Sequence, residues 1–300
     1  MQSHRTNHGK TGSGLTRGRM SRMFSGKRRL WTGLVAGIAL AAAAGTVASA
    51  ANSSSSSTSS VSVAAVSTPT GPTSLSKTWP TPTGTTNLTA TKAISGTYDG
   101  GMKRFQGWGG TQDEGQDPLF TVANGGTIKN VIIGAKAGDG IHCLGTCTIQ
   151  NVWWEDVGED AATQKGKVSG QVMTIDGGGA KKASDKIFQQ NGPGKTVIQN
   201  FVAQDFGKLY RSCGNCSTQY QRSVAFYNVM IVEPGKSLAG INTNYKDTAT
   251  FKWVRLYDAN KKISICDRFT GNSSGKEPTK TGSGADGTYC KYTSSDITYK

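Results

Sequence analysis

The fold is indicated by the segment Thr127-Ile-Lys-Asn-Val-Ile-Ile133, because its pattern returns three times further along the chain. The pattern is a short, β-branched strand with an asparagine near its centre. It recurs as Thr148-Ile-Gln-Asn-Val-Trp-Trp154, Thr196-Val-Ile-Gln-Asn-Phe-Val202 and Val224-Ala-Phe-Tyr-Asn-Val-Met230. The gaps between the asparagines are 21, 49 and 28 residues, and Val172-Met-Thr-Ile175 supplies a strand within the longest gap. One apolar strand per repeat of this length is typical of an all-β solenoid, a single-stranded parallel β-helix.

The four asparagines, Asn130, Asn151, Asn200 and Asn228, return at one phase of the repeat. Side chains at one phase of stacked coils can hydrogen-bond to one another and satisfy backbone groups at a turn. A β-sandwich or propeller is the alternative, but it would show hairpin turns at spacings of about 8–12 residues. These strands lie too far apart for that.

The amino-terminal region has the composition of a secretion signal. Residues 1–50 hold eight Lys or Arg residues and no Asp or Glu, and an apolar run from Trp31 to Ala48 leads into Ala48-Ser49-Ala50. A basic region, an apolar region and a cleavage site of small residues in this order predict export, with a membrane anchor as the alternative. We therefore expect a secreted, extracellular protein without stable membrane association. The pair Arg28-Arg29 leaves the export route open.

Residues 51–86 are rich in Ser, Thr, Pro and Gly and predict a flexible linker, so the folded domain is expected at 87–300. Subtracting the eight leader cations from the total of +15 leaves +7, from 26 basic and 19 acidic residues. Such an excess suits a polyanionic partner. No helix-turn-helix, zinc-finger or aromatic RNA-binding signature is present, so we expect the partner to be an acidic polysaccharide rather than nucleic acid. We expect the protein to be a monomer.

All six cysteines lie in the expected mature part, and an even count in an exported chain predicts disulfides. Proximity in sequence favours Cys143 with Cys147, Cys213 with Cys216 and Cys266 with Cys290, although other pairings are possible. A zinc site is the alternative, since Cys213-Gly-Asn-Cys216 is a CxxC motif, but a second close pair of similar spacing is missing.

Acidic residues cluster at one phase of two successive repeats. Asp139 lies in Gly138-Asp-Gly-Ile-His142, and Asp156, Glu159 and Asp160 follow one repeat later. Asp139 and Asp160 are 21 residues apart, the spacing of Asn130 and Asn151, and stacked coils lie about 4.8 Å apart. Carboxylates brought this close repel one another unless a cation lies among them, and oxygen ligands of irregular geometry suit Ca²⁺. A solvated acidic face is the alternative.

Three cations stand out beside this cluster. They are Lys186 in Asp-Lys-Ile-Phe-Gln, and Lys208 and Arg211 in Gly-Lys-Leu-Tyr-Arg; taken singly, each reads as an ordinary surface cation. His142 is the only histidine of the expected mature chain and reads as a coil residue beside the acidic site.

From about Thr91 to Lys300 the chain resembles the third polysaccharide-lyase family, a family of pectate lyases. The segments that carry the resemblance are Glu114-Gly-Gln-Asp-Pro-Leu-Phe, Gly125-Gly-Thr-Ile-Lys-Asn-Val-Ile-Ile-Gly, Gly138-Asp-Gly-Ile-His, Asn151-Val-Trp-Trp-Glu-Asp-Val-Gly-Glu-Asp-Ala, Asp185-Lys-Ile-Phe-Gln-Gln-Asn and Asp205-Phe-Gly-Lys-Leu-Tyr-Arg-Ser-Cys-Gly. The resemblance implies a right-handed β-helix and calcium-dependent cleavage of α-1,4-polygalacturonate by β-elimination, which leaves 4,5-unsaturated oligogalacturonates.

The resemblance also implies roles for particular residues. The implied calcium ligands are Asp139, Asp156, Val157 (through its carbonyl), Glu159 and Asp160. The implied catalytic residues are Lys186, Lys208 and Arg211, and Glu114, Lys208 and Arg211 are the implied substrate-binding residues. Calcium would neutralise the substrate carboxylate, Arg211 can bind a carboxylate through two hydrogen bonds, and a base must take the C5 proton. We expect Lys186 to be that base, with Lys208 or Arg211 as alternatives, and an alkaline pH optimum.

Two other functions fit parts of the pattern. A β-helical polygalacturonase would use two carboxyl groups about 6.5–9.5 Å apart, but its Asn-Thr-Asp, Gly-His-Gly and Arg-Ile-Lys motifs are absent. A β-helical adhesin or polysaccharide-binding module would use the basic surface without catalysis.

Overall fold

The computed structural model describes residues 67–111, 113 and 115–300. The predicted secretion signal, residues 51–66 of the predicted linker and Glu114 lie outside the described residues. The described part is almost entirely β-structure, and its strands are β1 (Thr85–Asn87), β2 (Lys92–Ile94), β3 (Thr97–Gln106), β4 (Phe120–Val122), β5 (Gly126–Ile133), β6 (Ile141–Cys143), β7 (Cys147–Trp154), β8 (Ala162–Gln164), β9 (Val172–Gln190), β10 (Gly194–Ser212), β11 (Arg222–Asn242), β12 (Thr248–Tyr257), β13 (Ser264–Thr270), β14 (Thr279–Ser283), β15 (Cys290–Lys291) and β16 (Ile297–Tyr299). Two 3-10 helices, η1 (Thr243–Tyr245) and η2 (Ser294–Asp296), accompany them. Within this part of the chain no helix is long and apolar enough to cross a membrane.

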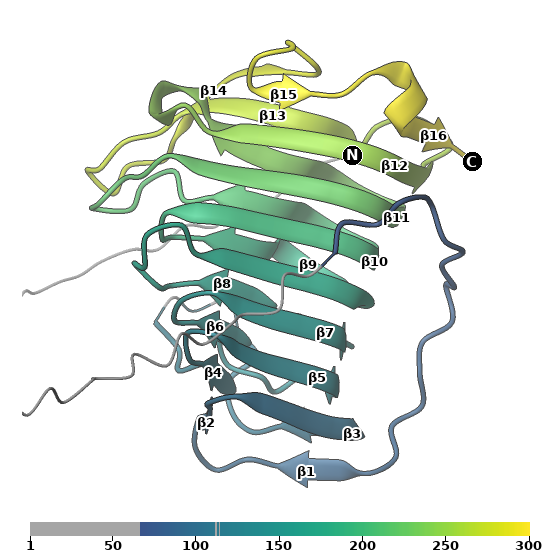
Figure 1. The fold of residues 1–300 in the computed structure, drawn as a ribbon, viewed down its shortest axis with the longest axis vertical. Helices are drawn as coiled ribbons and strands as arrows, with labels where there is room; N and C mark the ends of the chain where they lie inside the picture. The colour runs from purple at the N-terminus through teal and green to yellow at the C-terminus, as the bar shows by residue number, and fades with distance from the viewer. Residues whose placement is uncertain (1–66, 112, 114) are drawn as a thin grey trace, which may run out of the picture. The chain divides into compact units, whose positions relative to one another are not determined.

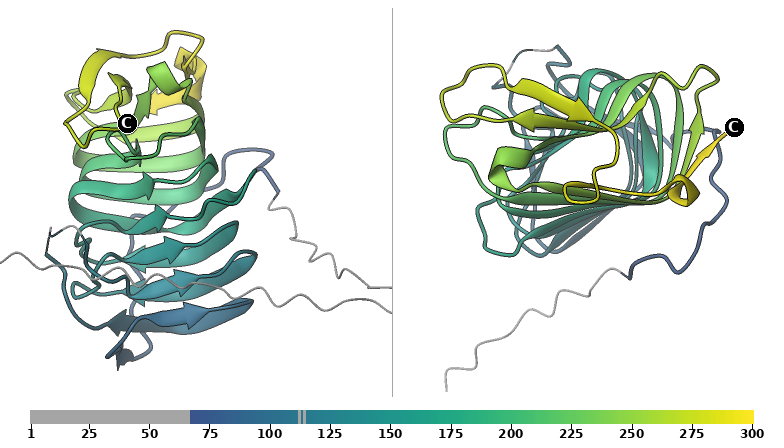
Figure 2. Two further views of the ribbon diagram at one scale, coloured as in Figure 1. Left: turned by 90° about the vertical axis from the view of Figure 1, so that its left-hand side faces the viewer. Right: turned by 90° about the horizontal axis from the view of Figure 1, so that it is seen from above.

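The strands stack as coils of a right-handed parallel β-helix, as predicted. Strands β1, β3, β5, β7, β9, β10, β11 and β12 follow one another in a single parallel ladder, and β2, β4, β6 and β8 form a second one that continues into β9. The long strands β9, β10 and β11 bend around the corners of the coil and so belong to more than one side (Figure 1). Seen along the stack, the coils enclose a common interior (Figure 2). Only β13 and β14, near the carboxyl end, pair antiparallel among the described strands.

An asparagine ladder forms one corner of the coils. Asn130, Asn151, Asn200 and Asn228 all adopt left-handed backbone conformations, with φ between 51° and 54°. Asn151 Nδ2 donates to Asn130 Oδ1 at 2.9 Å, and Asn228 Nδ2 donates to Asn200 Oδ1 at 2.8 Å. Asparagine tolerates this backbone conformation better than most residues, and its amide can both donate and accept along the stack. The repeat that predicted the fold is therefore a corner at which the chain turns the same way in successive coils.

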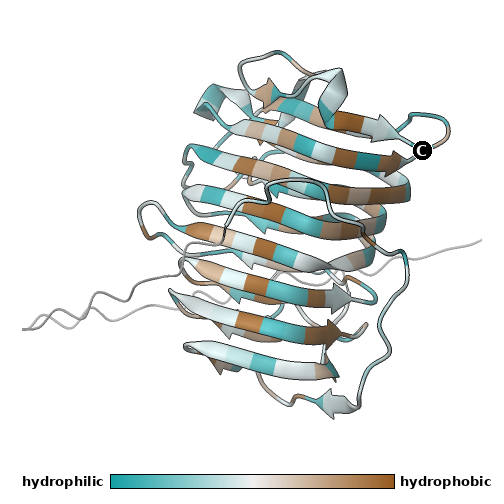
Figure 3. Cartoon of the chain, turned by 45° about the vertical axis from the view of Figure 1, so that its right-hand side comes forward, coloured by the Kyte–Doolittle hydropathy of each residue, from teal (hydrophilic) through white to brown (hydrophobic). Residues whose placement is uncertain are grey.

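The interior is filled by stacked apolar side chains. One column consists of residues paired in register on consecutive coils: Ile128, Ile149, Ile175, Ile198, Phe226 and Phe251. All of them are buried in the hydrophobic core. Figure 3 shows the alternation of apolar and polar residues along the strands that sends one set inward and the other outward.

The segment of residues 67–84, here called the outer strap, lies against the outside of the coils. Thr73 accepts hydrogen bonds from the side chains of Asn228, at 2.7 Å, and Arg255, at 2.9 Å. The rings of Trp79 and Trp153 meet edge to face at 5.1 Å. The strap carries no helix or strand, in keeping with its composition, and its contacts lie upstream of the predicted domain start at residue 87. Figures 1 and 3 show it running along the stack toward β1.

Three disulfides connect neighbouring parts of the chain. They join Cys143 to Cys147, Cys213 to Cys216 and Cys266 to Cys290, the pairs that sequence proximity favoured. No cysteine of the described residues is free, which removes the zinc alternative.

Candidate active site

Three carboxylates meet just before strands β6 and β8. Ile141 and Ala162 pair in register across these strands, so the residues two positions earlier, Asp139 and Asp160, lie on neighbouring coils. A carboxylate oxygen from each of Asp139, Glu159 and Asp160 lies within 4.8 Å of the others, and all three residues are buried. The spacing of 21 residues thus predicted their proximity correctly.

Oxygen atoms of this carboxylate cluster (Asp139, Glu159 and Asp160) are available to a cation. Asp139 Oδ1 and Asp160 Oδ1 are buried and accept no hydrogen bond from the described residues. The other Asp160 oxygen accepts a hydrogen bond from Thr163 at 2.9 Å, and the other Asp139 oxygen lies 2.6 Å from His142 Nε2. Buried carboxylate oxygens without hydrogen-bond donors are costly unless a positive charge lies near them, as the ammonium of Lys186 does for Asp160 Oδ1, at 3.6 Å. Together these oxygens could hold a hard metal ion such as Ca²⁺.

The carboxylates do not share one charge state. Burial, the charge of Asp160 and a hydrogen bond with Asp139 raise the pKa of Glu159 to about 9. Burial and the charge of Asp139 raise the pKa of Asp160 to about 7, although the ammonium of Lys186 opposes the increase. Burial is the largest influence on Asp139 and acts to raise its pKa, but hydrogen bonds with His142 and Glu159 and the charges of His142 and Lys165 together hold this pKa below the ordinary value. Without a cation, protons therefore remain in the cluster near neutral pH.

Lys186, on β9, is the cation nearest to the cluster. Its Nζ lies 3.0 Å from Glu159 Oε1, 3.6 Å from Asp160 Oδ1 and 2.7 Å from Asp185 Oδ2, and the side chain is buried. Burial alone would lower the pKa of Lys186, but the charge of Asp160 and the hydrogen bond to Asp185 raise it above the usual range. In this state Lys186 is a protonated hydrogen-bond donor, not a base.

Arg211, on β10, is held in place by groups from later coils. Its guanidinium donates to the carbonyl of Gly240 at 3.1 Å and to Asn242 Oδ1 at 3.0 Å, and it lies 4.2 Å from the ring centre of Phe269. Burial lowers the pKa of Arg211 to about 10, although the charge of Asp247 opposes the decrease. This support could not be predicted from the sequence, because Asn242 and Phe269 come from later coils.

A cavity of about 250 Å³ brings the predicted cations together. Residues from four segments line it: Asp185, Lys186, Gln189, Lys208, Arg211, Gly214, Asn215, Phe269, Glu277 and Pro278. Lys208 is partly exposed there, and its Nζ lies 3.1 Å from Asp185 Oδ1. The three cations expected to act on the substrate therefore line one cavity, and Lys186 also contacts the carboxylate cluster.

Asp156, another expected calcium ligand, is not among the three carboxylates that meet here. The Asp156 carboxylate is 43% exposed and lies 3.5 Å from Lys182 Nζ. The backbone N–H of Val157 donates to the carbonyl of Lys181 at 3.1 Å. Asp156 is in the predicted turn, but its side chain points to a lysine of the next coil rather than to Asp139.

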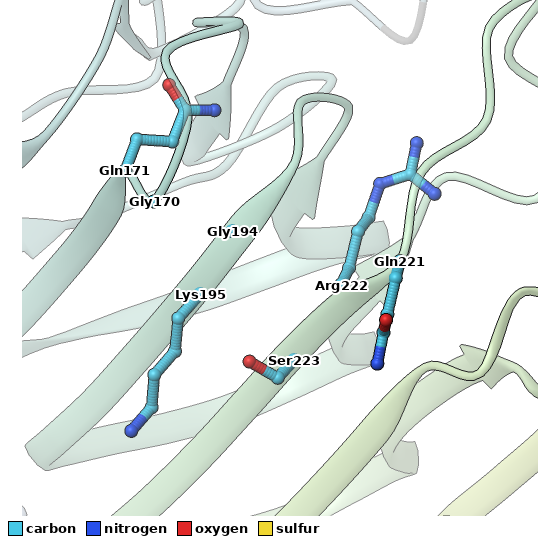
Figure 4. A pocket seen from close by; sticks show the side chains of 7 residues that line it. All are labelled: Gly170, Gln171, Gly194, Lys195, Gln221, Arg222 and Ser223. Atoms are coloured by element: carbon cyan, nitrogen blue, oxygen red, sulfur yellow. The ribbon is translucent and has the colours of Figure 1, made fainter.

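A second hollow, of about 280 Å³, lies at the starts of β9, β10 and β11 and contains none of the predicted site residues. It is lined by Gly170, Gln171, Gly194, Lys195, Gln221, Arg222 and Ser223 (Figure 4). Its buried arginine, Arg222, donates to backbone carbonyls, among them that of Asn191 at 2.7 Å. The guanidinium is thus already occupied by the protein.

Comparison with known proteins identifies the family of this chain. The pectate lyase family model matches residues 76–276. A pectate lyase E of Emericella nidulans is 48% identical over 218 residues, covering 71% of this chain and 83% of that protein. A probable pectate lyase E of Aspergillus clavatus is 48% identical over 226 residues, covering 72% and 86%.

Solved structures of pectate lyases are also similar to this chain. The catalytic domain of pectate lyase PelI from Erwinia chrysanthemi is 34% identical, with a TM-score of 0.63, covering 73% of this chain and 98% of that chain. PelI in complex with tetragalacturonic acid is 36% identical, also with a TM-score of 0.63, covering 71% of this chain and 70% of that one. The chain belongs to the pectate lyase family of polysaccharide lyases.

Proposed function

We propose that this chain is a secreted pectate lyase that cleaves α-1,4-polygalacturonate by calcium-dependent β-elimination, leaving 4,5-unsaturated oligogalacturonates. The observation that carries the proposal is a buried cluster of three carboxylates in direct contact with Lys186, which shares a cavity with Lys208 and Arg211. A relative has been solved with tetragalacturonic acid, which agrees with an acidic sugar chain as the substrate.

Asp139, Glu159 and Asp160 are the residues we expect to hold Ca²⁺, with Asp156 and the carbonyl of Val157 as further proposed ligands. When bound, Ca²⁺ would neutralise the substrate carboxylate, which acidifies the C5 proton, and its charge would favour the neutral amine of Lys186. The proposed contribution of Arg211 is to hold a substrate carboxylate with two parallel hydrogen bonds. Its hydrogen bonds to Gly240 and Asn242 support the guanidinium in that position.

Lys186 is the proposed base, with Lys208 and Arg211 as alternatives. Its Nζ would accept the C5 proton, the electron pair of the C5–H bond would form the C4–C5 double bond, and the bond from C4 to the glycosidic O4 would break. The leaving oxygen would then take a proton from a neighbouring acid or from water. A lysine that is neutral only at high pH predicts an alkaline optimum.

The proposed reaction has a product that hydrolysis cannot make. On polygalacturonate we expect ultraviolet absorbance from the conjugated double bond, abolished by EDTA and restored by added Ca²⁺. The Lys186→Ala variant should lose at least about 100-fold in kcat while still binding the substrate. Saturated products would point to a hydrolase, and binding without any product would point to an adhesin. A Lys186→Ala variant with unchanged kcat would move the base role to Lys208 or Arg211.

A further inference from the structure

The strand register creates an electrostatic problem at the active site. Lys186 on β9 and Lys208 on β10 are direct partners in the parallel ladder. Like charges placed opposite each other on neighbouring strands destabilise the pair. Lys186 has carboxylates of the cluster to compensate, but Lys208 makes no ion pair with that cluster. Some other group must fix the position of the Lys208 ammonium.

Asp185 lies between the two lysines. Its Oδ2 is 2.7 Å from Lys186 Nζ and its Oδ1 is 3.1 Å from Lys208 Nζ. Within the part of the chain that the structure describes, Asp185 is the one hydrogen-bond or ion-pair partner of the Lys208 ammonium. Each carboxylate oxygen therefore holds one of two cations that the ladder would otherwise set against each other.

A β-bulge makes this arrangement possible. Neighbouring residues of a regular strand point to opposite faces, so Asp185 and Lys186 would normally face apart. The ladder shifts here, because Ala183 pairs with Phe206 while Lys186 pairs with Lys208, which leaves one extra residue on β9. Bulges of this kind redirect a side chain.

The facing strand is adapted to the bulge. A Cβ atom on Gly207 would lie 2.3 Å from the carbonyl oxygen of Asp185 and 2.8 Å from that of Ser184. Only a residue without a side chain fits opposite the bulge, and the sequence has glycine there. The local backbone of two coils is thus arranged so that Asp185 and Lys186 share one cavity.

We propose that Asp185 is a positioning residue of the lyase, which holds Lys186 and Lys208 at a fixed separation for the substrate. This inference rests on the proposed function, since it takes the two lysines to act on the sugar chain. As a carboxylate in a cleft for a polyanion, Asp185 opposes substrate binding by its charge. Its benefit must therefore lie in the turnover step and not in affinity.

The test compares Asp185→Asn with Asp205→Asn, an exposed aspartate of the next coil, and with Asp185→Glu. We expect Asp185→Asn to lower kcat by about 10- to 100-fold, with KM unchanged or lower, because Lys186 and Lys208 would no longer be held in the position that turnover requires. Asp205→Asn should match the parent protein, and Asp185→Glu should recover part of the loss. A kcat of Asp185→Asn within about twofold of the parent, or a loss seen only in KM, would overturn the proposal.

A second readout does not depend on activity. Acetic anhydride labelling followed by peptide mass spectrometry reports how available the Lys208 amine is. Asp185→Asn should raise the labelling rate of Lys208, whereas Asp205→Asn should not change it. An unchanged rate would show that the carboxylate does not hold Lys208. If the parent protein makes no unsaturated product, the proposed function fails. The labelling measurement still tests whether Asp185 holds the Lys208 ammonium.

Discussion

At the residue scale, the carboxylate cluster links pH, cation binding and stability. Glu159 and Asp160 have pKa values of about 9 and about 7, raised first of all by burial. The folded protein therefore retains protons that the unfolded chain releases between the ordinary carboxyl pKa and these values. Where the folded state holds more protons, stability falls as pH rises. Lys186 adds nothing to this slope, because it is protonated in both states throughout that window.

We therefore expect the melting temperature without divalent cations to fall by several degrees between about pH 5 and pH 9. Added Ca²⁺ should stabilise strongly at the upper end and weakly at the lower end, since protons compete for the same oxygens. Thermal unfolding with EDTA or with CaCl₂ across this range measures both effects. Buried Asp247, whose pKa is also raised, acts in the same direction, so the calcium response is the decisive part. Equal stabilisation by Ca²⁺ at both ends would contradict the assignment of the cluster as a cation site.

At the scale of elements, the outer strap covers an apolar row that the coil pattern leaves on the outside. Ile132, Trp153, Val202 and Met230 belong to this row, in which Gly179 lies between Trp153 and Val202 in the ladder. Ile132, Val202 and Met230 are at most 3% exposed, although they do not belong to the core inside the coils. The strap contacts Trp153 through Trp79 and the flanking Asn228 through Thr73. It thus acts as a structural part of the domain.

Trp79→Ala should destabilise the fold by about 1–2 kcal/mol, because the half-buried ring loses its contacts with Trp153 and with Lys181. The matched control is Thr78→Ala, at an exposed position of the same segment. Urea unfolding followed by tryptophan fluorescence or circular dichroism gives the midpoints. An unchanged midpoint for Trp79→Ala would mean that the strap lies on the coils without stabilising them.

At the scale of the whole molecule, the cations that line the cavity suit a polymer with one carboxylate per sugar. Lys186, Lys208 and Arg211 line it from two adjacent coils, and the residues after the predicted signal carry a net charge of +7. Long-range attraction of this kind is screened by salt over distances of about 10 Å at 0.1 M. Association with a polyanion should therefore weaken as ionic strength rises.

We expect KM for polygalacturonate to rise several-fold as NaCl increases at fixed, saturating Ca²⁺, while kcat changes little. Short oligogalacturonates should show a smaller increase, because fewer charges reach beyond the cavity. Initial rates of double-bond formation at several salt concentrations give both constants. A KM independent of salt would show that binding rests on short-range contacts alone.

The features that repeat with the coil could be predicted from the sequence. In a solenoid, residues one repeat apart become neighbours in space, so the asparagine ladder and the proximity of Asp139 to Asp160 follow from spacing. The disulfides follow instead from proximity along the chain. Tertiary structure alone decided where individual side chains point. A bulge turns Asp185 into the cavity beside Lys186, Asp156 faces Lys182 rather than the cluster, and the strap covers an outer row. The reason is that periodicity fixes backbone phase, whereas side-chain direction depends on local register shifts and on packing against segments distant in sequence.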